Sequence, residues 1–532
     1  MWAMRQTTRC ADAAGWSREA QTMSISDTRR RGSGAQNNPN IRAQYPCRDA
    51  RTGDVLRTYD QPRPSEIDEI VSHARSAASW WAHLGFAQRQ RRLLAWKTLI
   101  ADSVDDLAQI ISTETGKPFD DAVLEIILTL GHLDWAAKNA RAVLSPRRVP
   151  VGLASMNHTA EFGYEPYGVV AVIGPWNYPL YTPMGSISYA LAAGNAVIFK
   201  PSDLTSGVAV WLAESWLRTN PEYPVLQTVP GDGSVGELLV RSGVDKVAFT
   251  GSTTTAKKVM AACAENLTPI VAECGGKDAM IVAADADLDH AADCAVAGGM
   301  GNSGQTCVGV ERVYVDHRVA SRFLEILDQK LARLRLGPRD DASYGPMTLS
   351  RQVDIVREHV KDALDRGGVA YRGGLDSIRP PYVEPILLVD VPEESAAVQE
   401  ETFGPTLVVN RVRTLDDAVA RANATPYGLG ASVFSGNLRT AKRLATRLRA
   451  GVVTINSILA FAGIAELPFG GVRGSGFGRI HGRFGLREFS IPKSIKVQRF
   501  ALPLNLLSME RTERDMAIAR KILAFTHGSR RD

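Results

Sequence analysis

Short apolar segments alternate with helical segments between about residues 166 and 274, and this alternation constrains the fold strongly. Four segments are almost continuously apolar, and each leads into glycine, proline or serine: 168–173, 196–199, 225–229 and 246–250. Helical periodicity is seen between them, near 182–193, 205–219 and 235–242. Apolar strands joined by helices are typical of a parallel sheet covered on both faces. Because ligands bind beyond the carboxyl ends of such strands, the loops that follow them are expected to face a ligand.

The segment before this alternation is predominantly helical. Pro64 opens a stretch with apolar residues at the spacing of an amphipathic helix, and further helices are predicted over 87–113 and 119–144. The alternation of strands and helices returns from about residue 275 to 470. A chain of 532 residues has room for two to four domains at roughly 100–200 residues each. We therefore predict an α/β protein with two parallel-sheet domains.

Composition and charge argue against several classes of protein. The 62 basic and 57 acidic residues leave a net charge of only +5, and no basic stripe contains interleaved aromatic residues, so no nucleic-acid partner is expected. No apolar run approaches the ~18 residues of a membrane span. The six cysteines show neither a CxxC pair nor metal-ligand spacing. We therefore predict reduced thiols, a cytoplasmic protein and no metal site.

The two ends of the chain differ from the rest. Residues 1–44 contain many serines and arginines but lack the apolar core of a secretory signal, and we expect a disordered extension or a true start at Met23. An organellar presequence is the alternative. Residues 505–532 form a basic amphipathic tail with Ile518, Ile522 and Phe525 on one helical face. Docking of this face on the protein's own surface is expected, and a membrane-surface helix is the alternative.

Three residues supply the groups needed for acyl chemistry. Cys307 ends a Gly-Gln-Thr-Cys segment, Glu273 precedes Cys-Gly-Gly-Lys, and Asn177 lies in a segment flanked by prolines. A thiol nucleophile, a carboxylate base and an amide donor can carry a carbonyl group through a covalent acyl intermediate. Taken singly, each residue has an ordinary structural explanation: Cys307 as a buried thiol, Glu273 as a surface acid and Asn177 as a turn residue. Their joint occurrence favours catalysis.

Two glycine-containing loops are candidates for nucleotide binding. Residues 231–236 match G-x-G-x-x-G, but no acidic residue ends a strand about 20 residues further on, and a tight turn into a helix explains the glycines equally well. Gly251 and Ser252 end another strand and open a helix, where free N–H groups favour a phosphate. Lys200 and Asp203 follow a strand of the same predicted sheet and supply a cation and an acceptor for a ribose hydroxyl.

The motifs, in their order along the chain, resemble those of the aldehyde dehydrogenase superfamily over about residues 45–500. They lie at 175–179, 194–203, 249–252, 273–277, 304–307, 400–405 and 468–471. The resemblance implies oxidation of an aldehyde to the carboxylic acid with NAD or NADP. Cys307 would attack the aldehyde, Asn177 would hold the oxyanion, and Glu273 would activate the water that hydrolyses the thioester. The cofactor would be held by Trp176, Lys200, Ser202, Asp203, Gly251, Ser252, Cys274, Glu401 and Phe403.

The same resemblance implies an aldehyde-dehydrogenase-like α/β fold, with two Rossmann-like domains and a bridging β-hairpin that pairs subunits. The cofactor domain would comprise 45–148 and 166–274, the catalytic domain 275–490, and the oligomerisation segment 149–165 and 491–504. A homodimer or homotetramer is therefore expected.

Two departures from the family pattern affect the cofactor and the mechanism. Asp203 stands where many NAD-preferring members have glutamate, so the choice between NAD and NADP stays open, with NAD as the first expectation. Ser186 stands where several hydrolytic members have a lysine. Because relatives that transfer the acyl group to coenzyme A often lack the base, Glu273 favours hydrolysis, and a coenzyme-A-acylating enzyme is the alternative.

The substrate is expected to be an apolar aliphatic or aromatic aldehyde. The residues expected around its entry are apolar or aromatic, and they are 458–464, Tyr178, Tyr181 and Met184. A carboxylate buried there without a partner would be costly. Similarity to succinate-semialdehyde dehydrogenases over 478–482 keeps that substrate as an alternative.

Overall fold

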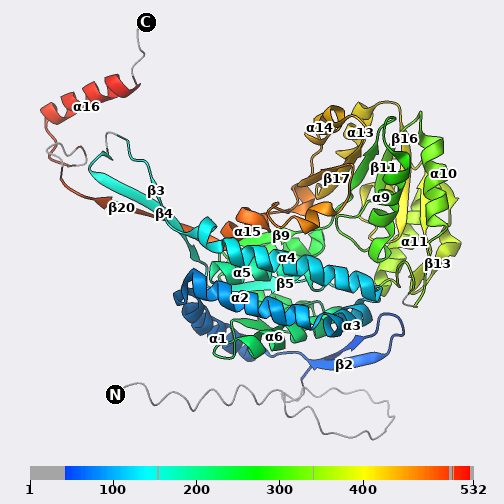
Figure 1. The fold of residues 1–532 in the computed structure, drawn as a ribbon, viewed down its shortest axis with the longest axis horizontal. Helices are drawn as coiled ribbons and strands as arrows, with labels where there is room; N and C mark the ends of the chain where they lie inside the picture. Colours follow the sequence, from blue (N-terminus) through cyan, green and yellow to red (C-terminus); the bar gives the residue numbers. More distant parts are fainter. Residues whose placement is uncertain (1–41, 153–154, 339–340, 502–505, 507, 528–532) are drawn as a thin grey trace, which may run out of the picture. The chain divides into compact units, whose positions relative to one another are not determined.

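The computed structural model describes residues 42–152, 155–338, 341–501, 506 and 508–527 (Figure 1). An antiparallel pair opens this part of the chain, and four helices follow. These elements are β1 Gln44–Arg48, β2 Val55–Asp60, α1 Pro64–His83, α2 Gly85–Asp102, α3 Val104–Thr115 and α4 Phe119–Leu144. The single helix predicted over 87–113 is wrong, because the backbone leaves helical geometry at Ser103 (φ −113°, ψ 25°). Asp105 and Asp106 then lie in the first turn of α3, where acidic side chains stabilise a new helix start.

The first large sheet has the strand order β19-β9-β8-β5-β6-β7. All its strand pairs are parallel except that of β19 with β9. The strands are β5 Val169–Ile173, β6 Ala196–Lys200, β7 Leu226–Thr228, β8 Lys246–Thr250, β9 Ile270–Glu273 and β19 Gly476–Phe477. The helices between the parallel strands are α5 Tyr181–Ala193, α6 Ser206–Thr219, α7 Gly233–Arg241 and α8 Thr253–Glu265. The alternation in the sequence therefore predicted β5, β6, β7 and β8 correctly, whereas β9 and β19 were not among the predicted strands.

The second large sheet has the order β12-β15-β16-β11-β10-β17-β18 and is parallel except at β12. Its strands are β10 Ala279–Val282, β11 Arg312–Asp316, β12 Val369–Arg372, β15 Ile386–Val389, β16 Thr406–Val412, β17 Gly430–Phe434 and β18 Val452–Ile455. A small hairpin, β13 Ile378–Arg379 and β14 Tyr382–Val383, lies between β12 and β15 in the chain. The helices of this half are α9 Leu288–Met300, α10 Ala320–Leu331, α11 Ser350–Asp365, α12 Ala396–Gln399, α13 Leu415–Ala422 and α14 Leu438–Ala445. Two parallel-sheet halves confirm the predicted fold class.

The predicted bridging hairpin is a sheet of three antiparallel strands, in the order β20-β4-β3 (Figure 1). β4 His158–Pro166 pairs with β20 Ser490–Gln498 along its whole length, and β3 Arg147–Val149 adds the third strand. The predicted domain boundaries stay predictions. Residues 476–488 nevertheless lie with the first half of the chain, since β19 pairs with β9 and α15 Gly482–Glu488 packs on α4 and α5.

The C-terminal tail forms the helix α16 Glu513–His527, and none of its residues is buried. Phe525 is 85% exposed, so the expected docking of the apolar face on the protein's own surface is not seen in the described chain. Among the helices that the structure describes, none combines the length and apolar character needed to cross a membrane. The predicted extension over 1–44 lies almost entirely outside the described residues.

Candidate active site

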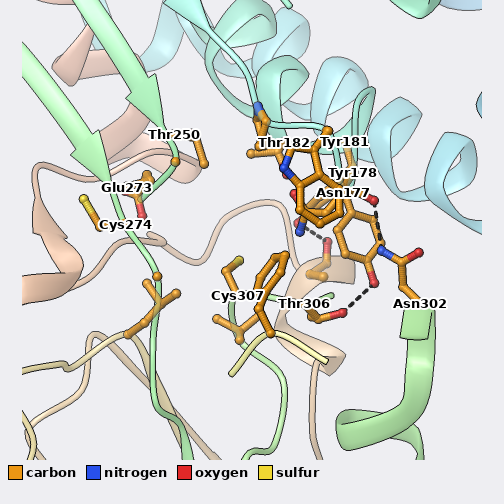
Figure 2. A pocket seen from close by; sticks show the side chains of 18 of the residues that line it. Asn177, Tyr178, Tyr181, Thr182, Thr250, Glu273, Cys274, Asn302, Thr306 and Cys307 are labelled. Atoms are coloured by element: carbon orange, nitrogen blue, oxygen red, sulfur yellow. Dashed lines mark hydrogen bonds between the residues drawn. The ribbon is translucent and has the colours of Figure 1, made fainter. Parts of the chain in front are cut away.

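A cavity of about 630 Å³ lies where β5, β8 and β9 end. This volume is in the range of roughly 300–1,000 Å³ that is typical of ligand sites. The cavity wall includes Asn177, Glu273 and Cys307, the three residues predicted to be catalytic. In Figure 2, Cys307 projects into the cavity between Glu273, at the end of β9, and Asn177. The structure therefore brings together groups that are far apart in the sequence.

The segment before Cys307 has an unusual backbone. Asn302, Ser303 and Gly304 are consecutive and all have positive φ, at 52°, 59° and 71°. Such conformations are costly for residues other than glycine and persist where the surroundings fix them. The hydroxyl of Ser303 donates to the carbonyl of Gly345 at 2.8 Å, which holds the turn in place. The turn ends just before Cys307 and presents it to the cavity.

The Cys307 thiol is a weak acid in this setting. Burial, followed by the nearby carboxyl groups of Glu401, Asp278 and Glu273, raises the pKa of the thiol to about 12. The thiol therefore keeps its proton at neutral pH in the protein without ligands. Because the thiolate is the nucleophilic form, the reaction requires a group that takes this proton.

Glu273 is a buried carboxyl group without a hydrogen-bond partner. The residue is 4% exposed, and among the described residues neither carboxylate oxygen has a partner. Burial raises the pKa of Glu273 well above its usual value, and nearby Arg479 and the backbone N–H of Gly471 oppose the rise. Leaving a polar group buried and unpaired costs free energy, and such carboxyl groups are concentrated at functional sites. Glu273 is therefore a candidate general base.

Asn177 is held at three points by neighbouring groups. Its side-chain Nδ2 donates to the carbonyl of Gln305 at 2.8 Å. Its own carbonyl accepts from Asn302 Nδ2 at 3.0 Å and from Lys117 Nζ at 2.9 Å. A side-chain amide has two N–H groups, so one N–H of Asn177 stays available for an oxygen in the cavity.

Six of the residues predicted to bind the cofactor line the same cavity: Trp176, Gly251, Ser252, Cys274, Glu401 and Phe403. The rings of Trp176 and Phe403 meet edge to face at 5.5 Å between centroids. The Glu401 carboxylate accepts from the backbone N–H of Gly276 at 3.0 Å. Ser252 caps the start of α8, where free N–H groups suit a phosphate. The wall thus combines helix N–H groups, a carboxyl group and two aromatic rings, which fit a nicotinamide dinucleotide.

Lys200, Ser202 and Asp203 do not line this cavity. Lys200 ends β6 and is buried, with its stem 3.7 Å from the position that a Cβ on Gly236 would occupy. Ser202 caps the short helix η4 Asp203–Thr205. All three residues lie at or just after the carboxyl end of β6.

The far wall of the cavity is mostly apolar and aromatic. It is formed by Leu124, Leu128, Tyr178, Tyr181, Leu459, Phe461, Ala462, Phe469, Ile480 and His481. Met184 was expected near the substrate entry, and this expectation is wrong, because its side chain is fully buried in the core around α5. Ile458 does not line this cavity and packs against the core of the second half. The sequence analysis did not predict that Leu124 and Leu128 line the cavity. Leu124 carried a usable signal, because it is an apolar residue outside the buried face of its helix and is 57% exposed.

Sequence reasoning also missed Lys117, Glu125 and Asn302, which surround the Asn177 segment. Glu125 had a detectable signal, since it shares the buried face of α4 with Ala122 and Ile126, and a carboxylate at a core position needs a partner. Lys117 and Asn302 act through contacts distant in sequence, for which the sequence carried no signal.

Two parallel sheets and a cavity that combines a thiol, a buried carboxyl group and a dinucleotide-binding wall define an α/β oxidoreductase. Residues 38–495 match the model of the aldehyde dehydrogenase family, and the chain belongs to that family. It is an NAD(P)-dependent aldehyde dehydrogenase, as the sequence predicted.

Individual relatives support this assignment. The chain is 39% identical over 453 residues to 4,4'-diapolycopene aldehyde oxidase of Methylomonas sp., which covers 85% of each chain. It superposes on an NADP-dependent enzyme from E. coli with a TM-score of 0.82 and 32% identity, covering 86% of this chain and 95% of the other. An indole-3-acetaldehyde dehydrogenase in complex with NAD+ superposes with a TM-score of 0.81 and 30% identity, covering 86% of this chain and 93% of the other. The cofactor is therefore NAD or NADP.

Proposed function

We propose that Cys307, Glu273 and Asn177 oxidise an apolar aldehyde to its carboxylic acid through a thioester on Cys307. The observation that carries this proposal is the shared cavity, which is lined by the three groups, by the residues proposed for the cofactor and by apolar side chains. Removal of the thiol, the base or the amide donor tests it, since each should block a different step.

In the first half-reaction the Cys307 thiol releases its proton to water, its sulfur bonds to the aldehyde carbon, and the carbonyl oxygen takes the negative charge. The free Nδ2–H of Asn177 and the backbone N–H of Cys307 donate to this oxyanion. The bound nicotinamide supplies the acceptor for the hydride that leaves the carbon. The oxygen re-forms its double bond as the hydride leaves, and Cys307 then carries a thioester.

In the second half-reaction Glu273 removes a proton from water as the water oxygen bonds to the thioester carbon. The carbon–sulfur bond breaks, and the carboxylic acid and the Cys307 thiolate are released. A base works best when its pKa lies near the working pH, and burial raises the pKa of Glu273 in that direction. The base favours water over coenzyme A as the acceptor.

For the cofactor we assign the nicotinamide end to Trp176, Glu401, Cys274 and Phe403, and the pyrophosphate to Gly251 and Ser252. The adenosine ribose is assigned to Lys200, Ser202 and Asp203, at the end of β6. NAD is the proposed preference, because the Asp203 carboxylate would repel a 2′-phosphate. Comparison of kcat/KM for NAD and NADP, and for Asp203→Ser with both cofactors, tests this assignment.

For the substrate we propose an aldehyde with an extended apolar group, held by the far wall. Leu128, Phe461 and Phe469 supply apolar surface there, and a relative that is named for an apolar aldehyde points the same way. Arg351 also lines the cavity. We assign it to the cofactor side and not to a substrate carboxylate, because its neighbour Gln352 donates to the carbonyl of Thr402, next to Phe403. Higher kcat/KM for long-chain aldehydes than for succinate semialdehyde would support this choice, and the reverse order would exclude it.

We propose that the protein is a cytoplasmic homodimer or homotetramer joined through the β3–β4–β20 sheet. Along β20 the side chains of Ile491, Ile495 and Val497 are 43–52% exposed, which is apolar surface for a second subunit to cover. Light scattering of the wild type and of Ile495→Lys tests this proposal. An unchanged mass for the variant would exclude this surface.

A further inference from the structure

Lys117 and Glu125 form an ion pair inside the protein, beside the cavity. Lys117 Nζ lies 2.6 Å from Glu125 Oε2, and the two side chains are 1% and 0% exposed. Removing two charges from water is costly, and such a pair is tolerated only where further hydrogen bonds satisfy the remaining polar atoms. The remaining contacts of the pair therefore indicate what it holds in place.

The remaining contacts go to one segment, Asn177–Tyr181. Lys117 Nζ donates to the carbonyl of Asn177 at 2.9 Å and lies 4.2 Å from the ring centre of Tyr178. Glu125 Oε1 accepts from the backbone N–H groups of Leu180 and Tyr181 at 2.9 and 3.0 Å. The lysine thus holds the start of the segment, and the glutamate holds its end.

Lys117 is itself fixed against movement. Its carbonyl accepts from the hydroxyl of Ser112 at 2.7 Å and from Arg51 Nη2 at 2.9 Å. Glu125 is fixed by its place on the buried face of α4. The pair therefore ties the segment between β5 and the start of α5 to the fixed positions of Lys117 and α4.

We infer that Lys117 and Glu125 are positioning residues that hold Asn177 where its amide can meet the oxyanion. This inference rests on the proposed function, because it assumes that Asn177 is the oxyanion donor. Donors act on a developing oxyanion only at about 2.7–3.1 Å, and a displacement of about 1 Å can cost about 100-fold in rate. Without the pair, Asn302 alone would hold the Asn177 carbonyl, and the end of the segment would lose both N–H contacts to Glu125.

A double-mutant cycle tests the inference with the full-length enzyme. Lys117→Met and Asn177→Ala are made singly and together, and the rate of nicotinamide reduction is measured in a single turnover with saturating aldehyde. Lys117→Met should slow this step about 10- to 100-fold in the wild-type background. In the Asn177→Ala background it should add no more than about twofold, because the two changes remove the same stabilisation.

Lys246→Met is the matched control, since Lys246 is also a buried lysine paired with a glutamate, Glu488, and does not line the cavity. This control should leave the single-turnover rate unchanged. Glu125→Gln tests the same inference if Lys117→Met does not fold. The loss of single-turnover rate that Glu125→Gln causes should likewise vanish in the Asn177→Ala background. The cofactor Kd should be unchanged in every variant.

Equal losses from Lys117→Met in both backgrounds would overturn the inference and leave the role of Asn177 intact. So would an unchanged rate in Lys117→Met when Asn177→Ala is slow. An unchanged rate in Asn177→Ala alone would overturn the proposed role of Asn177, and the inference with it. The two failures are therefore distinguishable.

Discussion

Asn302 Nδ2 donates a hydrogen bond of 3.0 Å to the backbone carbonyl of Asn177. The contact ties the left-handed turn that precedes Cys307 to the segment that carries the proposed oxyanion donor. The same Nδ2 lies 3.3 Å from the carbonyl of Gln305, which also accepts from Asn177. The nucleophile and the oxyanion donor are thus placed relative to each other by a side chain that does not itself react.

Replacement of Asn302 by alanine should lower kcat about tenfold with little change in the aldehyde KM, because alignment in the transition state is lost while ground-state binding remains. Steady-state kinetics would show this split. Asn423→Ala is the control, since Asn423 makes a similar amide-to-carbonyl contact at an exposed site. A loss confined to KM would contradict the prediction.

Replacement of Cys307 by alanine should abolish aldehyde oxidation, because no thioester can form, and should leave cofactor binding intact. Nicotinamide absorbance measures the first property and a fluorescence titration the second. Cys263→Ala, at a buried cysteine of α8 outside the cavity, should stay active. Substantial turnover by the Cys307 variant would remove the thiol from the mechanism.

The pH dependence of turnover should reflect the deprotonated forms of both acids. Burial raises the pKa of Glu273 well above 4.5 and that of the Cys307 thiol to about 12. Because the base must lose its proton to act, kcat should keep rising with pH well beyond the ordinary carboxyl range. A pH profile of kcat checks this expectation. A profile that levels off near pH 4.5 would mean that Glu273 is not the group that titrates.

Stability should depend on pH through Glu401. Burial and the neighbouring Glu311 raise the pKa of Glu401 from 4.5 to about 8, so the folded protein holds a proton that the unfolded chain releases. The contribution of this group to stability is complete below pH 4.5 and is lost as the pH rises through about 8. Denaturant unfolding across this range should show the decline, and Glu401→Gln should flatten it. Glu400→Gln, at an exposed neighbour, should not.

The parts of the fold that depend on local pattern were predictable from the sequence. The four strands predicted for the first sheet correspond to β5, β6, β7 and β8, and α4 Phe119–Leu144 has the predicted limits. The break at Ser103 was not predicted, because apolar residues continue through it. Docking of the α16 face was expected from its amphipathic pattern, but such a pattern shows only that a face could be covered and not what covers it.

The candidate site was predictable where a reactive residue lies in a distinctive motif. Cys307, Glu273 and Asn177 all line one cavity, and their catalytic roles stay predictions. Met184 was misplaced because its direction depends on how α5 packs. Lys117 was missed because its contact with Asn177 spans 60 positions, and nothing in the local sequence records such a contact.

The thioester on Cys307 is the central claim, and trapping it is the most direct test. Glu273→Gln should form the thioester but fail to hydrolyse it, so mixing with aldehyde and NAD should give one equivalent of reduced nicotinamide and then stall. Peptide mass spectrometry of the stalled enzyme should find the acyl group on Cys307, and the double variant with Cys307→Ala should carry none. Continued turnover by Glu273→Gln without an adduct on Cys307 would contradict the account.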